Sequence, residues 1–162
     1  MMSAMFDRFR TQPSAAGGPP DLDALPSVPV GDPDGLAAVP PEVLGAYLGL
    51  TVAAVAGPDE LGWTVHFSNG TSASIQLFPH DETATEFDQL RSKYQYQPSH
   101  DDLIELGIIQ VRGAPYETYH EGGTLAARGR AHDVVVKSAG LHSIYFTDVL
   151  TGLAALTLRV LG

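Results

Sequence analysis

The chain lacks cysteine and is poor in basic residues. The absence of cysteine excludes disulfide bonds, thiolate catalysis and cysteine-ligated metal sites. Lys and Arg number 9 against 19 Asp and Glu, which gives a formal net charge of -10 over 162 residues. A nucleic-acid-binding protein needs a basic surface to displace counterions, and an acidic chain is repelled by anionic lipid. The composition therefore argues against nucleic acid and membrane surfaces as partners.

Long apolar runs are also missing. No stretch approaches the ~18 apolar residues of a membrane span. The first residues, MMSAMFDRFR, place Asp7 and two arginines where a secretion signal requires an apolar segment. The location expected from the sequence is the cytoplasm.

Proline and glycine are concentrated near the start of the chain. The stretch TQPSAAGGPPDLDALPSVPVGDPDG has neither a helical nor a strand period, as is typical of linkers. We expect residues 1–39 to be a disordered or extended segment. Within it, Met5, Phe6 and Phe9 belong either to a flexible terminus or to a tethered docking peptide. The remaining residues, 40–162, are expected to form one domain.

The stretch WTVHFSNGTSASIQLF predicts a β-hairpin. A two-residue Asn-Gly turn would mix apolar and polar side chains on both faces, whereas a three-residue loop, Ser68-Asn69-Gly70, separates them. The predicted pairs are then Phe67–Thr71, Val65–Ala73, Trp63–Ile75 and Leu61–Leu77. The polar face carries Thr64, His66, Ser72, Ser74 and Gln76. This face is interpreted either as an ordinary solvated strand surface or as a platform for a ligand, a partner or a second copy of the chain.

Helical patterns flank this hairpin. PPEVLGAYLG suits a short helix that ends at its glycine, and LTVAAVAG suits a strand that ends at the following Gly-Pro turn signal. The spacing of Ala84, Phe87, Leu90 and Tyr94 predicts an amphipathic helix over roughly residues 82–95. Thr83 and Glu86 are its candidate capping box.

The second half of the chain predicts further strands and a closing helix. A strand is expected around residues 104–112, followed by an antiparallel meander with two-residue turns at the Gly-Gly of HEGGT and the Gly-Arg of RGRAH. The first turn places Glu117 opposite Arg128. A broadly apolar, well-buried helix is expected from about Thr147. The expected fold is α+β, an antiparallel sheet of about six strands with helices packed on one face.

Six histidines invite a metal or catalytic interpretation. In His80-Asp81, His100-Asp101-Asp102, His120-Glu121 and His132-Asp133 an acid follows the imidazole, but neighbours on a strand point to opposite faces. Neither His-x-His nor His-Glu-x-x-His occurs, so a metal site would have to be built from distant parts of the chain. The predicted registers place His120 opposite Leu125 and His132 opposite Ala127, on the same side. This candidate pair is either two packed imidazoles or a functional pair with lowered pKa values.

Motifs for other chemistry are absent. The sequence contains no Gly-x-Ser-x-Gly nucleophile elbow and no phosphate-binding Gly-x-x-x-x-Gly-Lys loop. No cofactor and no catalytic residue are predicted.

Several segments, taken in order, resemble the small PsbP-like domains of actinobacterial lipoproteins and sensor ectodomains. They are the hairpin WTVHFSNGTSASIQLF, the helix ATEFDQLRSKY, the strand pair GTLAARGRAHDVVVKSAG and the closing helix TDVLTGLAALTLRVLG. The resemblance covers about residues 50–162 and lies in layout and periodicity. It implies an antiparallel sheet with helices and a non-catalytic binding or accessory role, and it assigns no functional residue. We expect the chain to depart from those lipoproteins, because its first residues do not show the pattern of a signal peptide and it contains no cysteine that could be lipidated.

The sequence thus favours a non-catalytic binding or accessory domain whose partner is a protein or a second copy of the chain. The alternative is a histidine-dependent enzyme or metal protein that uses His66, His120 or His132.

Overall fold

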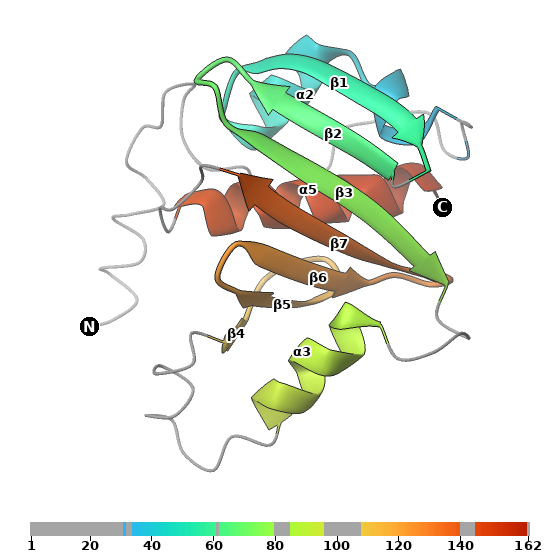
Figure 1. Ribbon diagram of the computed structural model, residues 1–162, viewed down its shortest axis with the longest axis vertical. Helices are drawn as coiled ribbons and strands as arrows, with labels where there is room; N and C mark the ends of the chain where they lie inside the picture. Colours follow the sequence, from blue (N-terminus) through green and yellow to red (C-terminus); the bar gives the residue numbers. More distant parts are fainter. Residues whose placement is uncertain are drawn as a thin grey trace.

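In the computed structural model, residues 31, 34–60, 62–79, 85–95, 108–139 and 145–161 are described. They form one seven-stranded antiparallel sheet with helices on both faces (Figure 1). The strands are β1 Val52–Asp59, β2 Gly62–Phe67, β3 Ser72–Pro79, β4 Ile108–Gln110, β5 Glu117–Glu121, β6 Thr124–Arg128 and β7 His132–Ala139. The helices are α2 Pro41–Leu48, α3 Glu86–Gln95 and α5 Tyr145–Leu161, with a short 3-10 helix, η1, at Gly35–Ala38. The strand order is β1-β2-β3-β7-β6-β5-β4, so that β7 joins the β1–β3 hairpins to the β4–β6 meander.

The predicted α+β class and antiparallel sheet are confirmed, with seven strands where about six were expected. The expectation that the helices share one face is wrong. Helices η1, α2 and α5 lie on one face, whereas α3 packs on the other, against β4, β5, β6 and β7. The reason is visible in β7, where Val134, Val135 and Val136 are consecutive and all buried, because both faces of the strand are covered.

Two hydrophobic clusters follow from this arrangement. The larger lies between the sheet and η1, α2 and α5, and includes Leu36, Leu44, Leu48, Val65, Ile75, Leu125, Val134, Val136, Leu150, Leu153 and Leu156. The smaller lies under α3 and consists of Phe87, Leu90, Tyr119, Ala126 and Val135, with Phe78 and Tyr94 packed against it. Helix α5 is buried along most of its length, as its broadly apolar sequence predicts.

The β2–β3 hairpin has the predicted register. Trp63 lies opposite Ile75 and Val65 opposite Ala73. The backbone N–H of Phe67 donates to the carbonyl of Thr71 at 2.9 Å, which closes the three-residue loop. Gly70 has φ 87°, a left-handed conformation that glycine adopts without a steric penalty. The predicted Leu61–Leu77 pair lies outside the described residues, because Leu61 is not among them.

The packed chain begins before residue 40, where the domain was expected to start. Leu36 and Val39 are buried in the larger cluster, and the indole N–H of Trp63 donates to the carbonyl of Asp34 at 2.9 Å. The candidate docking peptide lies within residues 1–30, outside the described part, as does most of the expected linker, which runs over residues 11–35. The sequence predicted that strand β1 ends at the Gly57-Pro58 turn signal. The strand instead continues through these two residues to Asp59.

Among the described residues, no helix combines the length and the apolar character that crossing a membrane requires.

Candidate functional site

The predicted polar face forms as expected on β2 and β3, and it lies on the same side of the sheet as α3. Thr64 lies opposite Ser74, and His66 opposite Ser72. His66 is exposed, and the others are half-buried. Helix α3 lies over the opposite end of the sheet, away from β1 and β2 (Figure 1). We call this surface the open face, defined as Thr64, His66, Ser72, Ser74 and Gln76.

Small and uncharged side chains extend the open face towards β1, whereas on the β7 side Ser74 lies opposite Lys137, which forms an ion pair with Glu86 of α3 at 3.0 Å. On β1, exposed Ala54 and Ala56 lie opposite His66 and Thr64. In residues 43–79, which span β1, β2 and β3, the sequence contains no Lys or Arg, and its acids are Asp59 and Glu60. The open face is therefore a patch of hydroxyl, amide and methyl groups with one imidazole. Such a patch can donate and accept hydrogen bonds with another surface.

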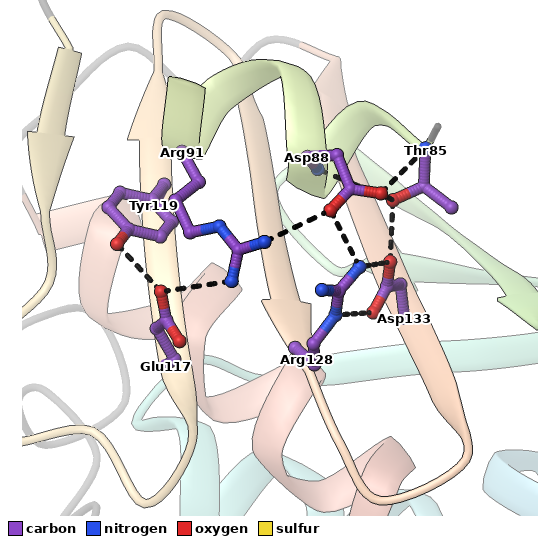
Figure 2. A network of polar contacts seen from close by, with 7 residues as sticks. All are labelled: Thr85, Asp88, Arg91, Glu117, Tyr119, Arg128 and Asp133. Carbon is purple, nitrogen blue, oxygen red and sulfur yellow. Dashed lines mark hydrogen bonds and ion pairs between the residues drawn. The ribbon is translucent and has the colours of Figure 1, made fainter. Parts of the chain in front are cut away.

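The opposite end of the sheet contains a network of charged side chains that the sequence analysis missed (Figure 2). It depends on the register of β6 and β7. Gly129 donates its backbone N–H to the carbonyl of His132, so the predicted two-residue Gly-Arg turn is wrong. Arg128 lies opposite Asp133 as a result, and Ala127 lies opposite Val134 and not His132.

Arg128 and Asp133 form the centre of this network. The Nε and Nη2 atoms of Arg128 donate to the two carboxylate oxygens of Asp133 at 2.7 and 2.8 Å, a bidentate pair. Asp133 is fully buried. Its Oδ2 also accepts a hydrogen bond from the hydroxyl of Thr85. The hydrogen bonds to Asp133 raise the pKa of Arg128 above its already high value, so the guanidinium stays charged.

Helix α3 contributes Asp88 to the same network. Nη2 of Arg128 donates to Asp88 Oδ1 at 2.9 Å, and the guanidinium lies 4.4 Å from the ring centre of Phe87, a cation–π contact. Burial alone would raise the pKa of Asp88, but hydrogen bonds from Thr85 and Arg128 outweigh it, and the pKa is lowered. Thr85 and Asp88 also bond reciprocally, each backbone N–H to the other's side chain, at 3.2 and 3.4 Å. The helix is thus capped by Thr85 and Asp88, whereas Thr83, proposed with Glu86, lies outside the described residues.

The network continues to β5 through Arg91. Its Nη2 lies 3.3 Å from Asp88 Oδ1, and its Nη1 lies 4.0 Å from Glu117 Oε2. The hydroxyl of Tyr119 donates to Glu117 Oε2 at 2.7 Å. Burial, together with this carboxylate, raises the pKa of Tyr119 to about 12. We call the set Thr85, Asp88, Arg91, Glu117, Tyr119, Arg128 and Asp133 the clamp, since its members bond to one another between α3 and the sheet.

The structure does not bring the predicted histidine pair together. His120 lies opposite Leu125, as predicted, and Leu125 lies opposite Val136. His132 is four residues from Val136 along β7, roughly 13 Å at strand spacing. Burial lowers the pKa of His120, whose Nδ1 lies 3.4 Å from the hydroxyl oxygen of Thr147 on α5.

In the described ranges, no three His, Asp or Glu side chains are placed to hold one metal ion. The candidates His80-Asp81 and His100-Asp101-Asp102 lie outside those ranges.

No family model, curated protein or solved structure matches the chain. The resemblance to PsbP-like domains therefore stays a prediction from the sequence.

Proposed function

We propose that this chain is a non-catalytic protein-binding domain that associates with a second copy of itself through the β1–β3 end of its sheet. The observation that carries the proposal is the contrast in charge between this end and the remainder of the molecule. Residues 43–79 hold two of the 28 charged residues of the chain, Asp59 and Glu60. The buried centres of protein interfaces are likewise depleted of charged side chains.

Electrostatics favours this end as the contact region. Two chains of net charge -10 repel each other, and the repulsion is weakest where the facing surfaces carry no charge. Small side chains such as Ala54, Ala56 and Ser74 also allow a second surface to approach closely. At the other end the ionic groups of the clamp already bond to one another, so they offer fewer groups to a partner.

A histidine-dependent activity has less support. The register separates His120 from His132, and His66 is exposed beside Ser72 and Ala54. A second function is not proposed on these residues.

The proposal is tested by measuring the mass of the full chain by size-exclusion chromatography with light scattering over a wide concentration range. We expect the mass to rise from that of one chain, 17.2 kDa, towards twice that value. Added salt should strengthen the association, because it screens the repulsion between acidic chains and does not compete with a neutral interface. A mass of one chain at every concentration and salt level would contradict the proposal, and weakening by salt would place the contact on charged groups instead.

A further inference from the structure

Helix α3 is attached to the sheet by much less apolar burial than α5. Two of its ten residues, Phe87 and Leu90, are buried, and Tyr94 is partly buried beside them. In α5, by contrast, every residue from Val149 to Leu158 is buried. Burial of apolar surface is the main source of stability, so an element that buries little of it opens at a lower free energy than the core. The apolar attachment of α3 thus depends mainly on two side chains.

Three exposed ion pairs also join α3 to the sheet. Each of the six side chains exposes at least 33% of its surface. The pairs are Glu86–Lys137 at 3.0 Å, Lys93–Glu121 at 3.3 Å and Arg91–Glu117 at 4.0 Å. Exposed pairs of this kind are individually weak, and salt screens them. Because these groups are already in contact with water, they can separate without leaving a buried charge unpaired.

The buried charges of the clamp lie within the sheet and remain paired when α3 is absent. Arg128 and Asp133 lie opposite each other on β6 and β7, and their bidentate bond involves no group of the helix. Removal of α3 takes the Asp88 carboxylate and the Thr85 hydroxyl away from this pair and leaves its two charges together. Breaking a buried ion pair is costly when it leaves one charge alone. Opening of α3 avoids that cost.

The surface beneath α3 is apolar and adjoins the open face. Val135 lies opposite Ala126, which lies opposite Tyr119, and all three are buried in the smaller cluster. On its other side, Val135 lies opposite Gln76 of the open face. Residues directly opposite each other on neighbouring strands project to the same face of a sheet, so these side chains form one row across β3, β7, β6 and β5. Without α3, the open face would continue into an apolar surface.

We propose that α3 is a releasable cover, which leaves the sheet as one unit while the strands, α2 and α5 stay folded. In the released state the open face extends over Val135, Ala126 and Tyr119. Salt favours release, because it screens the ion pairs that hold the helix and leaves the larger hydrophobic cluster intact. The cover thus controls how much apolar surface the sheet presents. It does so within one chain and does not depend on self-association.

Amide hydrogen exchange of the full chain, at a low protein concentration and with increasing urea or salt, tests the proposal. We expect the amides of residues 90–95 in α3 to exchange faster than those of α5 and β7. Their exchange should depend only weakly on urea, since a partial opening exposes less surface than complete unfolding. In about 0.5 M sodium chloride the α3 rates should rise roughly threefold or more. Rates in α3 that equal those of α5 and β7, or that salt leaves unchanged, would overturn the proposal.

Three substitutions distinguish release as a unit from the alternatives. Leu90→Ala removes a buried contact of α3 and should speed exchange throughout the helix at least about tenfold. Gln89→Ala, at an exposed position of the same helix, is the matched control and should change these rates little. Ile75→Val weakens the larger cluster, so it should speed exchange in α5 and β7 roughly two- to tenfold and leave α3 unchanged.

Two outcomes of these substitutions count against the releasable cover. If Ile75→Val speeds exchange in α3 as much as in α5, the helix opens only when the whole chain unfolds. If Leu90→Ala has no more effect than Gln89→Ala, the amides of α3 exchange by fraying of single residues while the helix stays on the sheet. Either result would overturn the proposal.

Discussion

At the β4–β7 end of the sheet, polar side chains bond to one another beneath α3, while at the β1–β3 end they remain at the surface. Arg128, Asp133 and Asp88 satisfy one another's charges within 2.9 Å. Thr64, Ser72 and Ser74, by contrast, have small polar side chains. None of the described helices provides a charged partner for them. The difference follows from coverage, because a charged group under a helix must be paired, whereas a hydroxyl at a surface is satisfied by water.

The two ends of the sheet consequently differ in the interactions that stabilise them and in the groups that they expose to a partner. The α3 end combines apolar packing around Phe87 with ionic bonds, so its stability should depend on pH. The β1–β3 end is held by apolar packing of residues such as Val65 and Ile75 and should be indifferent to pH. Four predictions, in decreasing order of expected effect, test this contrast.

Asp133→Ala should cause the largest loss, about 3–5 kcal/mol in the free energy of unfolding, because it leaves the Arg128 guanidinium without its main partner in a largely buried place. Urea denaturation measures the loss. The double variant Arg128→Met with Asp133→Val should recover much of it, since it removes both charges together. A loss below about 1 kcal/mol for Asp133→Ala would mean that the pair is no stronger than a surface ion pair.

Asp88→Asn should cost about 1.5 kcal/mol at neutral pH, the lower end of the range for hydrogen bonds to charged groups, because Asp88 is partly exposed. The pKa of Asp88 in the folded chain lies below the ordinary value of 3.8, so folding favours its ionised form. Its contribution is therefore complete above pH 3.8 and is lost as the pH falls through the lowered pKa. Unfolding free energies of the wild type and the variant should converge in acid, and a constant difference across this range would contradict the assignment.

Ile75→Val should cost about 0.5–1.5 kcal/mol, the usual range for the loss of one buried methylene. Ile75 is fully buried at the β1–β3 end, and the larger cluster in which it packs contains no carboxylate or imidazole. The loss should be the same at neutral and at acid pH, which distinguishes it from that of Asp88→Asn in the same urea titrations. A loss that changes with pH would show that the two ends are coupled.

Ser74→Ala should change the free energy of unfolding least, by no more than about 0.5 kcal/mol, because Ser74 is a half-exposed residue of the open face. Thermal denaturation at low protein concentration, where self-association does not contribute, measures the change. A substantially larger loss would show that the open face is part of the folded core.

Sequence patterns predicted those parts of the fold that local signals determine. The β2–β3 register followed from Asn69-Gly70 together with the need for one apolar face, and Gly122-Gly123 correctly placed Glu117 opposite Arg128. A slip of one residue would have turned every side chain to the wrong face, so alternation excluded it.

The β6–β7 register illustrates what alternation cannot determine. The predicted turn at Gly129-Arg130 shifts β7 by two residues, and a shift of two returns every side chain to its original face. The apolar pattern was therefore equally good in both registers, although the correct one alone brings Arg128 opposite Asp133.

The side of the sheet on which α3 packs was missed for a related reason. Ala126, Val135 and Tyr119 form a second apolar surface, but they lie on three strands, and no single strand shows the pattern. The consecutive valines of β7 were the available signal, since a strand that is apolar on both sides requires cover on both sides.

The contact between Trp63 and the segment before α2 has a practical consequence. Trp63 is the sole tryptophan of the chain; its indole N–H bonds to Asp34, and its ring lies so close to Gly35 that an added Cβ would be 2.5 Å away. Its fluorescence will therefore report whether that segment is packed on the sheet. The protein thus carries one native optical probe, at the β1–β3 end, with which the loosening of that end can be followed separately from the unfolding of the whole chain.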